Sequence, residues 1–281
     1  MALMTINVLS ELLGMPVDVT VCVPTYTVDD ITAGRSREIC RPGMKCQTLW
    51  LFHGGAGNHL DYVKNTNIVR YAEENKLAVV MPSDFNMGYT DHTKGGKYYT
   101  FHMEELPRIL RSILPLSAKR EDNFIGGLSG GSAMALKSAI LYPENFSVAL
   151  CMSGGGLPIP GQIPFKSTDD PAKRRKVGFP GPEIPADAEP FDLIEEVKKL
   201  QAEKREIPKL YLASGDRDWG FENLKFAYES LRELGVDCEF HSEEGFGHEW
   251  DFWELTLRKA LKNNWFPLRK GYSYIREVEE R

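Results

Sequence analysis

The sequence predicts an α/β protein with a mainly parallel β-sheet and helices on both faces. Short apolar runs of strand length alternate along the chain with segments whose apolar residues recur about every 3.6 residues. This alternation is typical of a parallel sheet that is covered on both faces. The candidate functional motifs directly follow the apolar runs, and in such sheets ligands bind at the carboxyl ends of the strands.

The expected strands are short. The segment 17–24 alternates between apolar and polar residues and ends at Pro24, which is typical of a strand at the edge of a sheet. The later segments are mostly apolar, as strands buried on both faces are. Beyond the edge strand, we expect strands at 48–52, 77–81, 124–125, 148–152, 210–213 and 238–240.

Five helices are expected between these strands. Each has apolar residues at helical spacing, which predicts one face that packs against the sheet. Their ranges are 62–74, 103–113, 132–141, 221–234 and 250–261.

The length and composition predict a single domain over residues 1–281. The chain is 42% hydrophobic and 26% charged, which are globular proportions, and it is long enough for one large core. The segment 157–190 interrupts the strand–helix alternation and is rich in proline, glycine and charge. Structureless segments of this length are usually functional or disordered. We expect either a lid or substrate wall or a plain surface insertion there.

Charge and cysteine content exclude several functional classes. The formal net charge of −6 argues against a nucleic-acid partner, and the densest basic cluster, 173–176, fits a solvated loop. The five cysteines are odd in number and include no C-x-x-C pair, so neither a disulfide framework nor a zinc site is expected. Neither a signal peptide nor an apolar stretch of ~18 residues is evident. We therefore expect a cytoplasmic protein with no membrane partner.

The segment 127–131, with the sequence GLSGG, carries the strongest chemical signal. It lies between an expected strand and an expected helix and matches G-x-S-x-G, the pattern of a nucleophile elbow. Small residues on both sides of Ser129 allow the strand and the helix to approach closely and leave the hydroxyl exposed. Ser129 is therefore the candidate nucleophile for acyl transfer.

A serine hydroxyl needs a neighbouring base, and in chains with such an elbow the acid and the histidine follow the serine. Only His241 and His248 follow Ser129. His248 lies in a glycine-containing loop between a strand and a helix, which suits a base, whereas His241 at a strand end fits a surface position. Residues 248–252 lack the second histidine of H-E-x-x-H, so no metal site is expected.

The acid that orients the histidine should follow the strand at 210–213. Asp216 and Asp218 both lie there. Asp216 is next to Arg217 and fits a turn or an ion pair. Asp218 precedes an expected helix and also fits a helix N-cap. The residues alone favour Asp218 only slightly.

An oxyanion hole requires backbone N–H donors aimed at the developing charge. One donor is expected from the residue after the nucleophile, Gly130, and the other from the glycine-rich loop 52–58. We expect His53 in this loop to be a structural hydrogen-bonding residue rather than a second base. No phosphate-loop or dinucleotide-binding glycine pattern is present, so no cofactor is expected.

Several segments together resemble the esterase D-like α/β-hydrolases, especially tributyrin esterases and related acetyl and feruloyl esterases. The resemblance runs over most of the chain. The segments that carry it are 97–101, 104–107, 120–129, 142–146 and 247–253. It implies the α/β-hydrolase fold and an oligomeric state.

The resemblance also implies roles for individual residues. It makes Ser129 the nucleophile, His248 the base and Asp218 the acid, because that family's acid stands three residues after a glycine, here Gly215. The second oxyanion donor corresponds to Gly55. The chain departs from the family at Gly130, where a bulkier residue is common, and in the proline-rich segment 157–190.

The expected function is a serine carboxylesterase acting on short-chain or aromatic acyl esters, including esters linked to carbohydrates. A thioesterase or an S-formylglutathione hydrolase would use the same residues, and a non-catalytic binding protein on the same fold is a further alternative. The aromatic residues Trp219 and Trp250 could line an acyl pocket or belong to the core.

Overall fold

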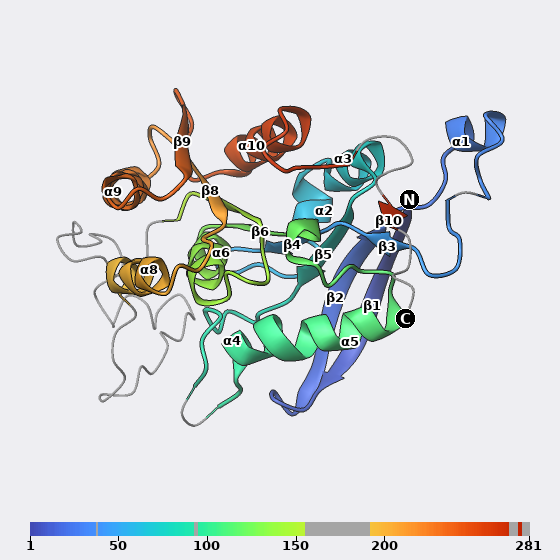
Figure 1. The fold of residues 1–281 in the computed structure, drawn as a ribbon, viewed down its shortest axis with the longest axis horizontal. Coiled ribbons are helices and arrows are strands. Elements are labelled where there is room, and N and C mark those ends of the chain that lie inside the picture. Colours follow the sequence, from blue (N-terminus) through green and yellow to red (C-terminus); the bar gives the residue numbers. More distant parts are fainter. Residues whose placement is uncertain (38, 93–94, 155–191, 270–274, 277–281) are drawn as a thin grey trace.

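The computed structural model describes residues 1–37, 39–92, 95–154, 192–269 and 275–276. An eight-stranded sheet forms the centre of these residues, in the order β1-β2-β5-β4-β6-β7-β8-β9 (Figure 1). Neighbouring strands from β5 to β9 are parallel, and β1 and β2 are antiparallel to their neighbours. The strands are β1 (Ala2–Ser10), β2 (Met15–Val23), β4 (Thr48–Phe52), β5 (Ala78–Pro82), β6 (Asn123–Leu128), β7 (Val148–Met152), β8 (Lys209–Gly215) and β9 (Cys238–Glu243).

Helices cover both faces of this sheet (Figure 1). One face is covered by α2 (Asp61–Asn65), α3 (Ile68–Asn75) and α10 (Trp250–Lys262). The other is covered by α5 (Leu106–Ile113), α6 (Gly130–Leu141), α8 (Leu193–Ala202) and α9 (Phe221–Glu233). The remaining described elements are α1 (Val28–Thr32), α4 (Tyr98–Thr100), η1 (Phe101–Glu105), η2 (Arg120–Asp122) and a two-stranded sheet of β3 (Lys45–Cys46) and β10 (Ile275–Arg276).

Two buried clusters, one on each face, hold the helices against the sheet. Strand β4 contributes to both, because successive side chains of a strand point to opposite faces. Trp50 and Phe52 belong to the cluster under α5, α6, α8 and α9, whereas Leu49 and Leu51 belong to the cluster under α3 and α10. The central strands are buried on both sides, which explains their nearly continuous apolar sequences.

The predicted α/β fold with a mainly parallel sheet is confirmed, but the prediction of which strand lies at the edge of the sheet is wrong. The expected edge strand at 17–24 is β2, which pairs with β1 on one side and with β5 on the other. The edge strand is β1, whose exposed residues include Leu3 and Leu9. The residues of β1 alternate between the two faces of the sheet, which is the ordinary signal of a strand with one buried face.

Two expected helices are interrupted, one by a side-chain hydrogen bond and the other by a proline. The segment 62–74 divides at Thr66, whose hydroxyl donates to the Tyr62 carbonyl and accepts from the Ile68 N–H. The segment 103–113 begins in the π-helical turn η1, because Pro107 cannot donate a backbone hydrogen bond to the preceding turn. This turn places His102 in the interior.

The expected insertion at 157–190 lies outside the described residues, so its role stays a prediction, as does the single domain over 1–281. In the part of the chain that the structure describes, no helix is both long and apolar enough to cross a membrane.

Candidate active site

Ser129 lies at a sharp turn between β6 and α6. Its backbone has φ 53° and ψ −117°, a positive φ that is uncommon for a residue other than glycine. Its N–H donates to the carbonyl of Met152 at 2.9 Å, which ties the turn to the end of the neighbouring strand β7. Strained backbone of this kind clusters at functional sites, where the surrounding structure holds it in place.

Glycines around Ser129 are required by close backbone packing. A Cβ on Gly131 would lie 2.2 Å from the Phe52 carbonyl oxygen, and one on Gly127 would lie 2.3 Å from the Gly131 carbonyl oxygen. A Cβ on Gly54 would lie 3.0 Å from the Ser129 Cβ. The loop after β4 therefore packs directly against the serine.

The two expected oxyanion donors lie on exposed backbone beside this contact. Gly55 follows Gly54 in the loop, and Gly130 is the first residue of α6. The first N–H groups of a helix have no intrahelical acceptor, so the Gly130 N–H can donate to a ligand. A Cβ on Gly130 would meet no described atom within 4 Å, so space is open there.

His248 and Asp218 form a hydrogen-bonded pair. The Nδ1 atom of His248 lies 3.0 Å from Oδ2 and 3.2 Å from Oδ1 of Asp218. Asp218 follows β8 and is buried, and His248 lies in the loop between β9 and α10. Because Nδ1 faces the carboxylate, Nε2 is the ring nitrogen left to act as a base.

Asp218 is held ionised by its partners. Burial by itself would raise the pKa of Asp218, but hydrogen bonds from His248, Ser153 and the Gly220 N–H outweigh it and lower the pKa below its ordinary value. The Gly220 N–H donates to Oδ1 at 2.8 Å. An ionised carboxylate at this position stabilises an imidazolium ion.

Ser153 and Trp253 support the pair, and sequence reasoning assigned them no role. The indole N–H of Trp253 donates to the Ser153 hydroxyl at 2.9 Å, which leaves the hydroxyl proton for Asp218. Ser153 is buried, with φ 54°, directly after β7. That position at a strand end was the only sequence signal for it.

Two tryptophans flank the imidazole of His248. The ring of Trp253 meets it edge-on at 5.1 Å between centroids, and Trp219 lies 4.5 Å away at an interplanar angle of 35°. Trp219 is 51% exposed. Trp250 instead meets Tyr62 and Trp253 edge-on and packs against the core cluster under α10.

Asp216, His241 and His53, which are less suitable candidates by sequence, have other contacts. Asp216 accepts the Gly245 N–H at 2.7 Å, away from His248. His241 stacks on Trp265 and meets Glu239. His53 is buried, and both of its ring nitrogens are hydrogen-bonded to backbone, as expected of a structural residue.

Ser129, Asp218, Gly55 and His248 all lie on loops after parallel strands, at the carboxyl edge of the sheet. Within the described residues, the Ser129 hydroxyl makes no hydrogen bond with His248. Catalytic hydrogen bonds often tighten only when substrate binds. The described residues also contain no group of three or more side chains that could hold a metal ion.

A mainly parallel sheet with a strained serine turn and a histidine paired with a buried aspartate defines a serine hydrolase of the α/β-hydrolase fold. A family model with the description "Putative esterase" matches residues 38–263. The chain therefore belongs to this esterase family and is a carboxylic ester hydrolase.

Individual relatives agree with this assignment. The acetyl esterase of Caldicellulosiruptor saccharolyticus is 31% identical over 270 residues, covering 93% of this chain and 97% of that protein. Among solved structures, the fluorophosphonate-binding serine hydrolase FphF of Staphylococcus aureus is 26% identical with a TM-score of 0.74, covering 93% of this chain and 97% of that one. The S-formylglutathione hydrolase FrmB of S. aureus has the same fold at 24% identity, with a TM-score of 0.73 and the same coverage.

Proposed function

We propose that the protein is a serine carboxylesterase in which Ser129, His248 and Asp218 form the catalytic triad. The observation that carries the proposal is the buried Asp218 carboxylate on Nδ1 of His248, at the same sheet edge as the strained turn of Ser129. This arrangement sets the tautomer of the imidazole, so that Nε2 is available to take a proton.

The reaction proceeds in two steps. The Ser129 oxygen attacks the ester carbonyl carbon while His248 Nε2 takes the hydroxyl proton, and the proton then passes to the leaving alcohol as the carbon–oxygen bond breaks. Water attacks the resulting acyl-serine, again losing its proton to His248, and the carboxylic acid leaves as the proton returns to Ser129. The buried, ionised Asp218 stabilises the transient imidazolium.

The N–H groups of Gly55 and Gly130 would bind the oxyanion of both tetrahedral intermediates. Gly54 packs against Ser129, which brings the next residue in the loop close to the carbonyl under attack. Each donor of this kind contributes roughly 3 kcal/mol to transition-state stabilisation.

The substrate class is short-chain or aromatic acyl esters. The similarity to an acetyl esterase supports a small acyl group, and the open space at Gly130 together with the exposed indole of Trp219 beside His248 leaves room for a larger one.

A fluorophosphonate probe tests the proposed nucleophile directly, because it reacts with activated serines. The experiment is to label the protein with a fluorophosphonate and map the labelled peptide by mass spectrometry. We expect one modified residue, Ser129, with no labelling of Ser129→Ala and parallel loss of ester hydrolysis. Modification of another serine, or hydrolysis that survives Ser129→Ala, would refute the proposal. A panel of acetyl, butyryl and feruloyl esters, together with S-formylglutathione, then separates an oxygen esterase from a thioesterase.

A further inference from the structure

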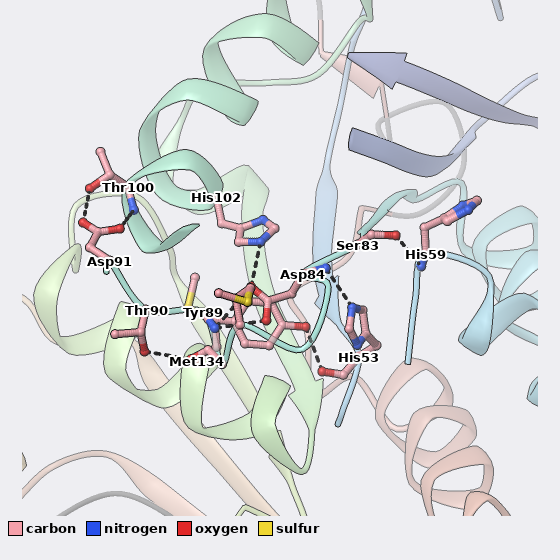
Figure 2. Close-up of polar contacts among 12 residues, drawn as sticks. His53, His59, Ser83, Asp84, Tyr89, Thr90, Asp91, Thr100, His102 and Met134 are labelled. Carbon is pink, nitrogen blue, oxygen red and sulfur yellow. Dashed lines mark hydrogen bonds and ion pairs between the residues drawn. The ribbon is translucent and has the colours of Figure 1, made fainter. Parts of the chain in front are cut away.

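A buried polar network lies behind the loop that carries Gly55, on the side away from solvent. Asp84, Tyr89 and His102 are each less than 5% exposed, and Figure 2 shows Asp84 lying between His102, Tyr89 and His53. Asp84 and Tyr89 belong to the loop after β5, and His102 belongs to the π-helical turn η1. None of these side chains reaches the surface, so their effect on the site must pass through the backbone that they hold.

Hydrogen bonds join the loop after β5 to the loop after β4, and three of them lie beside Gly54–Gly55. The Tyr89 hydroxyl donates to the His53 carbonyl at 2.8 Å, and the Asp84 N–H donates to Nε2 of His53 at 3.0 Å. The side chain of Asn86 accepts the N–H of Ala56. The residues before and after Gly54–Gly55 are therefore both fixed by one neighbouring loop.

The His53 ring transmits one of these contacts to Gly54. Because Nε2 accepts from the Asp84 N–H, the proton of the neutral ring must be on Nδ1, which donates to the Gly54 carbonyl at 2.6 Å. Burial lowers the pKa of His53, so the ring stays neutral and keeps this tautomer. An imidazolium would present a proton to the Asp84 N–H and break the arrangement.

Planarity of the peptide bond links the anchored carbonyls to the Gly55 N–H and to the Gly54 N–H that precedes it. In a trans peptide the C=O and the next N–H point in opposite directions. The His53 ring holds the Gly54 carbonyl and so fixes the direction of the Gly55 N–H. The Tyr89 hydroxyl holds the His53 carbonyl and so fixes the peptide that carries the Gly54 N–H.

The Asp84 carboxylate holds the supporting loop in its strained shape. Phe85, Asn86 and Tyr89 all have positive φ, which is costly for residues with large side chains. Both carboxylate oxygens of Asp84 accept the Tyr89 N–H, at 3.2 and 3.1 Å, and His102 Nε2 lies 3.4 Å from Oδ1. Burial raises the pKa of Tyr89 well above its ordinary value, so its hydroxyl remains a donor.

We propose that Asp84, Tyr89 and His53 are positioning residues that orient the Gly55 N–H toward the substrate oxyanion. This inference rests on the proposed function, because Gly55 matters only if a tetrahedral oxyanion forms beside Ser129. The predicted signature is a loss of kcat with little change in KM, since oxyanion contacts strengthen in the transition state.

The first test compares Tyr89→Phe with Tyr62→Phe. Tyr62 is a matched control, because its buried hydroxyl donates at 2.9 Å to the Phe52 carbonyl, so that it holds a peptide one residue farther from the Gly55 N–H than the peptide held by Tyr89. We expect Tyr89→Phe to lower kcat by about tenfold, less than outright removal of a donor. We expect Tyr62→Phe to keep kcat within about twofold while the two variants lose thermal stability equally.

The second test separates the two nitrogens of His53. Asn can present an amide N–H near the position of Nδ1, whereas Gln can present an oxygen near the position of Nε2. We expect His53→Asn to retain more kcat than His53→Gln, because only the asparagine can still hold the Gly54 carbonyl. The thermal midpoint of each variant reports any general loss of folding.

Each outcome decides a different claim. Equal kcat in Tyr89→Phe and Tyr62→Phe, with Ser129→Ala inactive, would overturn the positioning role and leave the proposed triad intact. If kcat for His53→Gln is at least as high as that for His53→Asn, the His53 ring does not position the Gly54 carbonyl. The proposed triad would again be unaffected. Hydrolysis that persists in Ser129→Ala would refute the proposed function and this inference with it.

Discussion

Nδ1 of His248 lies 3.0 Å from Oδ2 of Asp218, and Asp216, only two residues away, points its carboxylate at the Gly245 N–H instead. The two aspartates could not be separated firmly from local sequence, because both follow the same strand. The structure assigns them different partners, and the difference can be measured.

Asp218→Asn should reduce kcat by about 10³- to 10⁴-fold, because an amide would stabilise the wrong tautomer of His248 and would not stabilise the imidazolium. Asp216→Asn removes only a turn contact and should keep kcat within about twofold. Steady-state hydrolysis of a short activated ester measures both. If Asp216→Asn proves the more damaging variant, the assigned acid is wrong.

Asp218 should also make folding stability depend on acid pH. Its pKa is lowered in the folded state, so its contribution is complete above the ordinary value of 3.8 and is lost as pH falls through the lower folded-state pKa. Urea unfolding of wild type and Asp218→Asn from pH 7 to pH 3 measures the difference in unfolding free energy. The difference should be constant at neutral pH and shrink toward pH 3, and a difference that grows in acid would contradict the assigned pKa direction.

Gly130 and Gly131 should respond in opposite ways to the same substitution. Gly130→Ala places a methyl group in open space at the start of α6 and should leave the thermal midpoint unchanged or slightly higher. Gly131→Ala drives a methyl group into the carbonyls of Phe52 and His53 and should cost about 1–3 kcal/mol. Thermal unfolding of the two variants tests this.

The activity of Gly130 variants tests its place beside the acyl group. Gly130→Leu should slow hydrolysis of a feruloyl ester more than that of an acetyl ester, because the side chain occupies space beside Ser129. An equal effect on both esters would show that the acyl group does not approach Gly130.

The sequence predicted the parts of the molecule that depend on local pattern. The strand at 148–152 has the same bounds as β7, and the glycines at 127 and 131 lie where close packing requires them. These features are readable because a buried strand and a tight turn each restrict which residues can occupy consecutive positions.

The contacts that connect distant segments could not be read in this way. Nothing in the sequence near Ser153 indicates that Trp253, 100 residues later, donates to its hydroxyl. The same holds for Asp84 and His102, which meet through a π-helical turn that apolar spacing does not reveal. Strand β1, which was not among the expected strands, differs from these contacts, because the alternating pattern of its residues is a local signal that does indicate a strand.

Trp219 should determine selectivity between aromatic and small acyl groups. Its indole lies 4.5 Å from the His248 ring and is 51% exposed, so it can stack with an aromatic acyl group at little cost to folding. Trp219→Ala should lower kcat/KM for a feruloyl ester about five- to tenfold more than for an acetyl ester, the range expected for one lost aromatic contact. Its unfolding free energy should change by only about 0.5 kcal/mol.

Trp219→Phe is the matched control, because it keeps an aromatic face beside the imidazole. It should restore most of the selectivity that Trp219→Ala loses, whereas Trp219→Leu, which is apolar but not aromatic, should not. If Trp219→Ala slows acetyl and feruloyl esters equally, the indole acts on the orientation of His248, which it also contacts, and not on the acyl group. The ratio of the two kcat/KM values therefore separates substrate stacking from support of the base.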